Sequence, residues 1–175
     1  SLWNKNISII PTSIDLNKYP VDLLSFKDFD RSSVVIGWIG TPKTFKYLSP
    51  LLGVFDRLSK VYNLSVYVIG VDGKDSEIFK YIPWSEDTEF NYLSKIDIGI
   101  MPLPDREFER GKCGYKLIQY MGCGVPVVAS PVGVNGDIIK NGFNGFLSDS
   151  EEWYDTLQKL ICSNRFLIMK KNSRV

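Results

Sequence analysis

The sequence contains no histidine in its 175 residues. This absence excludes Ser-His-Asp and Cys-His catalysis, histidine general bases and the common zinc sites. The three cysteines, Cys113, Cys123 and Cys162, are odd in number and lack the spacing of a metal site, so a reducing cytosol suits them best. Any chemistry must therefore use carboxylates, lysines, backbone amides or a group from outside the chain.

The sequence also lacks an excess of positive or negative charge and lacks a long apolar run. A formal net charge of only +1 argues against a general nucleic-acid-binding surface. No apolar run approaches the ~18 residues of a transmembrane helix, and no signal peptide opens the chain, so we expect neither a membrane span nor secretion. Hydrophobic residues at 44% and charged residues at 23% are ordinary for one compact domain with its own core.

The pattern that is present alternates apolar strands with helical stripes. Residues 33–40 are the clearest strand, because their continuous apolar character is typical of a central parallel strand. A helical stripe then runs to Lys60; its members are Leu48, Leu51, Leu52, Phe55 and Leu58. Other strands are expected at 7–15, 64–70, 78–83, 96–102, 126–130 and 141–147, and helices at 85–95, 115–121, 137–140, 151–161 and 164–171. Residues 16–30 are expected to form an extended connection and 103–109 a loop. The alternation predicts an α/β fold, a doubly wound, Rossmann-like parallel sheet with helices on both faces.

The stretch 110–130 carries the strongest chemical signal. A glycine-bracketed loop leads into a helix from Tyr115 to Met121, which ends at the glycines of 122–124. Such a loop exposes unpaired backbone N–H groups at the positive end of a helix, which is a phosphate-binding geometry. Arg110, Lys112 and Lys116 oppose the helix dipole there, and a bound anion would offset that cost. The alternative is that they are ordinary solvated charges.

The run 116–130, with its Gly-Cys-Gly-Val-Pro-Val-Val-Ala-Ser segment, resembles the donor-site signature of retaining glycosyltransferases of the GT-B fold, family 4 (glycosyl transferases group 1). The segments 7–15 and 141–147 also resemble that family. The resemblance implies one half of a GT-B fold. Residues 1–32 would be an interdomain linker and lead-in segment, and residues 33–175 the nucleotide-sugar-binding domain. An N-terminal acceptor domain would be absent from this chain.

The resemblance also implies an activity. A hexosyl group would pass from a nucleoside-diphosphate sugar to a glycan or lipid-linked acceptor held by the N-terminal domain, with no metal and no cofactor besides the donor. Polysaccharide biosynthesis would be the setting, in the cytoplasm or at the inner face of the membrane. This domain alone would bind donor weakly and transfer nothing.

Roles carry over position by position. Lys43 falls on the family's lysine on the diphosphate, and Lys116 at the start of the helix is also assigned to the diphosphate; these two are the catalytic candidates. Gln119 falls on the second motif glutamate, which contacts the ribose, and Lys112 lies near the sugar. The remaining donor-binding candidates are Gly40, Thr41, Trp84, Gly114, Tyr115 and Leu117. A tryptophan at this strand end can stack on a base, but plain packing is equally common.

Two departures from the family pattern leave alternatives open. Gly111 occupies the position of the first motif glutamate, and Trp38 that of an arginine. Either Lys112 or Glu109 contacts the sugar, or this is a divergent branch with altered donor contacts, or activity is lost. A catalytically inactive nucleotide-binding or interaction module is thus the second hypothesis. A third is an unrelated flavin or dinucleotide binder, with Asp72 as its ribose-binding acid.

Overall fold

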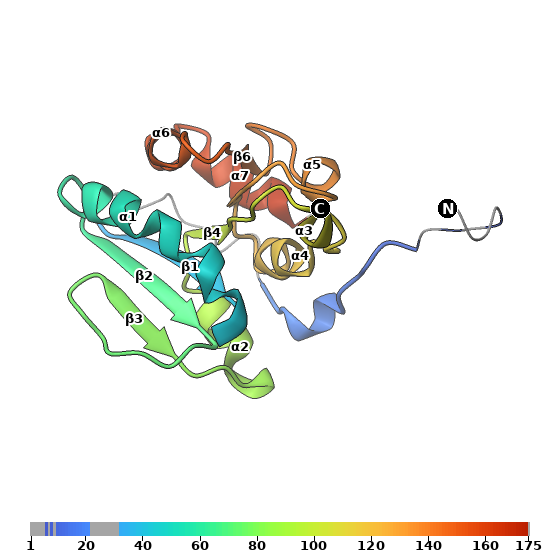
Figure 1. Ribbon diagram of the computed structural model, residues 1–175, viewed down its shortest axis with the longest axis horizontal. Helices are drawn as coiled ribbons and strands as arrows, with labels where there is room; N and C mark the ends of the chain where they lie inside the picture. The colour runs from blue at the N-terminus through green and yellow to red at the C-terminus, as the bar shows by residue number, and fades with distance from the viewer. Residues whose placement is uncertain (1–5, 7, 9, 22–31, 175) are drawn as a thin grey trace.

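The computed structural model describes residues 6, 8, 10–21 and 32–174, and its centre is a twisted sheet (Figure 1). Among these residues, six strands form one parallel sheet in the order β3-β2-β1-β4-β5-β6. They are β1 (Val34–Ile39), β2 (Leu64–Ile69), β3 (Phe79–Ile82), β4 (Ile98–Met101), β5 (Val127–Ala129) and β6 (Gly145–Leu147). This is a doubly wound strand order, and it confirms the predicted fold class.

The central strands are continuous in apolar character because both of their faces are covered. β1 pairs with β2 on one side and with β4 on the other, and every residue of β4 is buried. Gly37 in β1 leaves room for Ile96, whose Cδ1 atom would lie 2.1 Å from a Cβ at that position. The strand expected at residues 33–40 is therefore confirmed, with the burial that its composition predicts.

Helices pack on both faces of the sheet. The helices are α1 (Leu52–Ser59), α2 (Glu86–Leu93), α3 (Glu107–Arg110), α4 (Tyr115–Gly122), α5 (Asn135–Ile138), α6 (Trp153–Ile161) and α7 (Phe166–Ser173), and the 3-10 segments are η1 (Leu16–Lys18), η3 (Pro42–Tyr47) and η4 (Ser49–Leu51). One buried cluster joins α1, α6 and α7 to the sheet, and another joins α2 and α4 to it. The apolar stripe expected on 151–161 is confirmed, since α6 buries Trp153, Leu157, Leu160 and Ile161.

The helical stripe from Leu48 to Lys60 is only partly right. The chain runs through η3 and η4 before α1 begins; Pro42 is the first residue of η3 and Pro50 the second residue of η4, and neither can donate a backbone hydrogen bond. Leu52 lies off the stripe and is 39% exposed, whereas Phe55 and Leu58 are fully buried. Likewise, the loop expected at 103–109 runs into the helical turn α3.

The lead-in segment departs from the predicted strand at 7–15. Its described residues 10–15 have no strand hydrogen bonds, and Ile7 and Ile9 lie outside the described residues. The connection expected at 16–30 begins with the 3-10 turn η1, and Tyr19 is buried as an anchor. Leu23, Leu24 and Phe26, three further large apolar residues of this connection, lie outside the described residues. Among the helices that the structure describes, none combines the length and apolar character needed to cross a membrane.

Candidate functional site

The sheet has its topological switch point between β1 and β4. The chain goes from β1 to β2 on one side of β1, and it later returns to place β4 on the other side. Ligands of open parallel sheets bind at the carboxyl ends of the strands, where the strand order reverses. Gly40 follows β1 and Pro102 follows β4, so the segments after these residues border the expected crevice.

The N-terminus of α4 is built on a glycine in the left-handed region. Gly114 is the N-cap, with φ 70° and ψ 16°, and its carbonyl accepts the N–H groups of Leu117 (2.9 Å) and Ile118 (3.3 Å). A Cβ at this position would lie 2.4 Å from Ile138 Cδ1 on α5. Only glycine combines this backbone with so close a neighbour. The expected loop-to-helix geometry is thus present, and the first N–H groups of α4 lack acceptors within the helix.

Lys112 lies in the loop before α4, and Lys116 lies in the first turn of that helix. Both line a shallow hollow whose other walls are Trp38, Thr44, Tyr47, Met101, Pro102 and Leu103. Burial, together with the charge of Lys112, lowers the pKa of Lys116 below its ordinary value. In the described part of the chain neither lysine forms an ion pair with a carboxylate. The Lys112 ammonium does lie over the rings of Tyr47 and Phe108, at 5.6 Å and 5.1 Å from their centroids. Two cations without a carboxylate partner at the positive end of a helix favour a bound anion.

Arg110 does not join these lysines. Its guanidinium donates two hydrogen bonds to Asp105, from Nε at 2.6 Å and from Nη2 at 2.9 Å. The ion pair lowers the pKa of the Asp105 carboxyl and holds the arginine on α3. The expectation that Arg110 adds to the anion site is wrong, because a carboxylate five residues earlier in the chain already neutralises its charge.

A cavity of about 160 Å³ adjoins the first turns of α4 through Tyr115 and Gln119. Its walls come from η1 and the residue after it, from α2 and the segment before it, and from α4. The lining residues are Lys18, Tyr19, Trp84, Glu86, Glu89, Phe90, Tyr115 and Gln119. Tyr115 and Gln119 are one turn apart on α4 and line the cavity, whereas Lys116 on the same helix lines the hollow.

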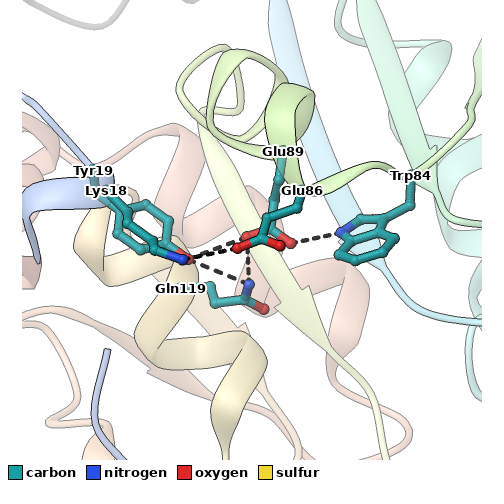
Figure 2. A network of polar contacts seen from close by, with 6 residues as sticks. All are labelled: Lys18, Tyr19, Trp84, Glu86, Glu89 and Gln119. Atoms are coloured by element: carbon teal, nitrogen blue, oxygen red, sulfur yellow. Dashed lines mark hydrogen bonds and ion pairs between the residues drawn. The ribbon is translucent and has the colours of Figure 1, made fainter. Parts of the chain in front are cut away.

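Polar contacts inside the cavity converge on Glu89 (Figure 2). Its carboxylate accepts hydrogen bonds from Trp84 Nε1 (2.6 Å), Gln119 Nε2 (2.6 Å) and the Tyr19 hydroxyl (3.1 Å). Burial raises the pKa of Tyr19 to about 12, so its hydroxyl stays a donor at neutral pH. An ion pair between Lys18 and Glu86 (2.8 Å) lies beside this network.

The structure brings six of the predicted site residues together around the first turns of α4: Trp84, Lys112, Gly114, Tyr115, Lys116 and Gln119. Gln119 is only 4% exposed, whereas Trp84 is 54% exposed. The Leu117 side chain is buried in the core, so this residue offers no side chain to a ligand.

The site residues predicted after β1, Gly40, Thr41 and Lys43, line neither the hollow nor the cavity. The Gly40 N–H donates to Ile69 and the Thr41 N–H to Thr44 Oγ1, both at 2.9 Å. Lys43 is exposed on η3.

Several residues at this site carried no signal in the sequence. Glu89 and Tyr19 reach the cavity only because α2 and the lead-in segment pack against α4. Tyr47 lies in the hollow and donates a 2.5 Å hydrogen bond to Glu109, which is 5% exposed. This hydrogen bond lowers the pKa of the Glu109 carboxyl. Glu109 thus already has a partner, and Lys112 is the one of the two proposed sugar contacts that lines the hollow.

Comparison with known proteins gives one family and a set of similar structures. The profile of the family described as Glycosyl transferases group 1 matches residues 33–163. HepE of Anabaena, solved with UDP and glucose, has 16% sequence identity and a TM-score of 0.69; the match covers 92% of this chain and 49% of that protein. TarM of S. aureus, solved with fondaparinux, alpha-GlcNAc-glycerol and UDP, has 16% identity and a TM-score of 0.66, covering 88% and 34%.

A third structure matches over nearly its whole length. The C-terminal domain of LpcC, a glycosyl transferase group 1 family protein from Francisella tularensis, has 16% identity and a TM-score of 0.63, with 93% of this chain and 95% of that domain covered. The chain therefore spans about a third of TarM and half of HepE. No curated protein sequence matches.

Proposed function

Since this chain belongs to the glycosyl transferases group 1 family, we propose that it is the donor-binding domain of a glycosyltransferase. Its ligand is a nucleoside-diphosphate sugar. One observation carries the proposal: the first turns of α4 border both a basic hollow and an aromatic cavity, and Lys112 and Lys116 form no ion pair with a carboxylate among the described residues. A nucleotide sugar has the matching order of parts, a nucleoside and a sugar joined by a diphosphate.

The diphosphate binds at the N-terminus of α4. The first N–H groups of the helix and the Nζ atoms of Lys112 and Lys116 supply hydrogen bonds and positive charge there. When the glycosidic bond to the β-phosphate breaks, negative charge grows on the leaving diphosphate, and these same groups stabilise it. We assign this role to the protein's own cations, and donor binding is expected to persist in EDTA.

The nucleoside occupies the 160 Å³ cavity, where the exposed ring of Trp84 offers a stacking surface for the base. HepE and TarM were both solved with UDP, so UDP is the first nucleotide to test. The sugar then lies toward the hollow that contains Lys112 and Tyr47.

Transfer itself needs a second domain. A retaining transferase breaks the bond between the anomeric carbon and the diphosphate, and forms a bond to an acceptor oxygen on the same face of the sugar. We propose a hexosyl group as the transferred unit and a glycan or a lipid-linked saccharide as the acceptor, bound by an N-terminal domain. Three free thiols, Cys113, Cys123 and Cys162, support a reducing, cytoplasmic location.

The test is calorimetric titration of the chain with UDP, GDP and ADP and with their sugar conjugates. One nucleoside diphosphate is expected to bind. Lys116→Ala is expected to lower the affinity for it by about tenfold or more, as for the loss of a charge-assisted hydrogen bond. Lys60→Ala is the matched control, because Lys60 is exposed and paired with Asp56 on α1. Equal affinities for wild type and Lys116→Ala would contradict the proposal.

A second candidate, an inactive nucleotide-binding module, is favoured by one observation. Gly111, at the position of the family's sugar-contacting glutamate, is exposed and brings no side chain to the sugar. If the complete protein bound the donor but neither transferred nor hydrolysed its sugar, this candidate would replace the first.

A further inference from the structure

Glu89 is the most highly connected side chain of the nucleoside cavity. Three donors from three segments converge on its carboxylate: Trp84 Nε1, Gln119 Nε2 and the Tyr19 hydroxyl (Figure 2). A carboxylate offers about four lone-pair sites on its two oxygens. At least one site thus remains for a ligand, and Glu89 lines the cavity in which that ligand would lie.

The surroundings of Glu89 suit a ribose attached to a flat base. Trp84 and Tyr115 line the same cavity with rings that are 54% and 44% exposed. Tyr115 is also the first residue of α4, so the cavity adjoins the proposed diphosphate position. Doubly wound nucleotide-binding domains often use an acidic side chain to accept hydrogen bonds from ribose hydroxyls. Glu89 is the acid placed for that task.

Gln119 cannot perform the task equally well. It is nearly fully buried, and its amide group already donates to Glu89 Oε1 at 2.6 Å and to the Tyr19 hydroxyl at 3.4 Å. Its remaining acceptor, the neutral amide oxygen, forms weaker hydrogen bonds than a carboxylate does. Gln119 and Trp84 therefore fix the orientation of the Glu89 carboxylate.

We propose that Glu89 of α2 binds the ribose hydroxyls of the donor nucleotide, and that it replaces a carboxylate that α4 lacks at Gln119. The inference rests on the proposed function, since it requires a nucleotide in the cavity. It makes Glu89 a ligand-binding residue and Gln119 a positioning residue.

The experiment compares UDP, its 2′,3′-dideoxy analogue and inorganic pyrophosphate as ligands of the same chain in calorimetric titrations. Wild type is expected to bind UDP about 10- to 100-fold more tightly than the dideoxy analogue, as for hydrogen bonds to a charged group. In Glu89→Gln that preference is expected to fall to a few-fold, while pyrophosphate affinity stays unchanged. A general loss of folding would lower the affinity for all three ligands together.

Asp87→Asn is the matched control, because Asp87 lies on the same helix, is exposed and does not line the cavity. It is expected to keep the full preference for UDP. Equal binding of UDP and the dideoxy analogue by wild type would overturn the inference while leaving the proposed function intact. Failure of wild type to bind any nucleoside diphosphate would overturn both.

Exchanging the carboxylate and the amide between positions 89 and 119 tests whether Glu89 takes the place of a carboxylate at position 119. Gln119→Glu alone places two carboxylates in direct contact and is expected to weaken UDP binding. The double variant Glu89→Gln with Gln119→Glu keeps one amide and one carboxylate, and it is expected to regain at least about tenfold discrimination against the dideoxy analogue. A double variant with no more discrimination than Glu89→Gln alone would contradict the claimed exchange.

Discussion

At the scale of single residues, Lys116 is the side chain with the clearest electrostatic consequence. It holds an amine in a half-buried position beside Lys112, which lowers its pKa below the ordinary value of 10.5. A bound diphosphate favours the ammonium form, so the pKa of Lys116 is higher in the complex than in the free chain. Under the proposed function, donor affinity is therefore expected to be full well below the lowered pKa and to fall as pH rises through it.

The prediction concerns the pH dependence of UDP affinity between about pH 7 and about pH 10, measured for wild type and Lys116→Arg. An arginine stays charged over this range, so the variant is expected to lose less affinity than wild type toward the alkaline end. Titration of the ligand itself cancels in the ratio of the two affinities. A ratio that stayed constant with pH would show that Lys116 does not carry the charge that binds the diphosphate.

Gly111 is a second residue at which a single change is informative. A Cβ there would have the Phe108 carbonyl oxygen as its nearest neighbour, at 3.5 Å, and φ is −79°. Gly111→Glu is thus expected to fold with a Tm close to that of wild type. A carboxylate restored at this position is expected to raise affinity for UDP-sugar relative to UDP by about tenfold, as for a charge-assisted hydrogen bond. An unchanged ratio in calorimetry would mean that the sugar lies away from residue 111.

The residues of the site differ in how well the sequence predicts them. Lys112, Tyr115 and Lys116 follow from their place beside a glycine turn, because the helix that follows fixes their positions locally. Arg110 was assigned wrongly, because local pattern does not show its pairing with Asp105.

At the scale of secondary-structure elements, α4 is held to the sheet by a buried tyrosine. The Tyr120 hydroxyl accepts the N–H of Ile39 in β1 at 2.8 Å, and Gly99 in β4 leaves space for its ring. This contact sets the distance between the helix N-terminus and the switch point. Tyr120→Phe leaves the Ile39 N–H unsatisfied and is expected to cost about 1–3 kcal/mol of stability.

Thermal unfolding measures that cost, with an expected fall in Tm of at least about 2 °C for a chain of this size. Tyr92→Phe is the control, since the Tyr92 hydroxyl appears in none of the hydrogen bonds found among the described residues. A Tm for Tyr120→Phe that matched the control would contradict a role for this hydroxyl in fixing α4.

The glycine turn before α4 leads to a further prediction. Gly114→Ala introduces strain of about 1–2 kcal/mol from the left-handed backbone, and its Cβ must also displace Ile138. Both Tm and UDP affinity are expected to fall, because the first N–H groups of α4 move with the turn. The control is Gly53→Ala in α1, where a Cβ meets nothing within 4 Å and about 0.5–1 kcal/mol of stabilisation is expected. Gly114→Ala with wild-type Tm and affinity would contradict this account of the turn.

Helices and strands could be predicted from the sequence where a single apolar pattern determined them. The buried strands and the stripe of α6 follow from apolar pattern alone. The expected stripe from Leu48 to Lys60 begins instead with the 3-10 turn η4, where Pro50 removes a backbone donor from a stretch whose apolar spacing is otherwise helical.

At the scale of the whole molecule, the candidate site joins segments that are distant in sequence. Tyr19 and Gln119 form a hydrogen bond across 100 positions, and Glu89 and Gln119 across 30. The lead-in segment also packs beneath α4, where a Cβ on Gly122 would lie 2.6 Å from Ile14 Cδ1. Alternation of strands and helices predicts the fold class, but these contacts depend on tertiary packing that no local pattern contains. The cavity could therefore not be predicted from the sequence, whereas the N-terminus of α4 beside it could.

We propose that a nucleoside diphosphate lies across the N-terminus of α4, with its nucleoside in the cavity. The decisive experiment is a crystal structure of this chain with UDP. We expect phosphate oxygens within hydrogen-bond distance of the first N–H groups of α4 and of Lys116 Nζ, and ribose hydroxyls on the Glu89 carboxylate. UDP bound away from α4, or lying with its uracil in the hollow of Lys112 and Tyr47, would contradict it.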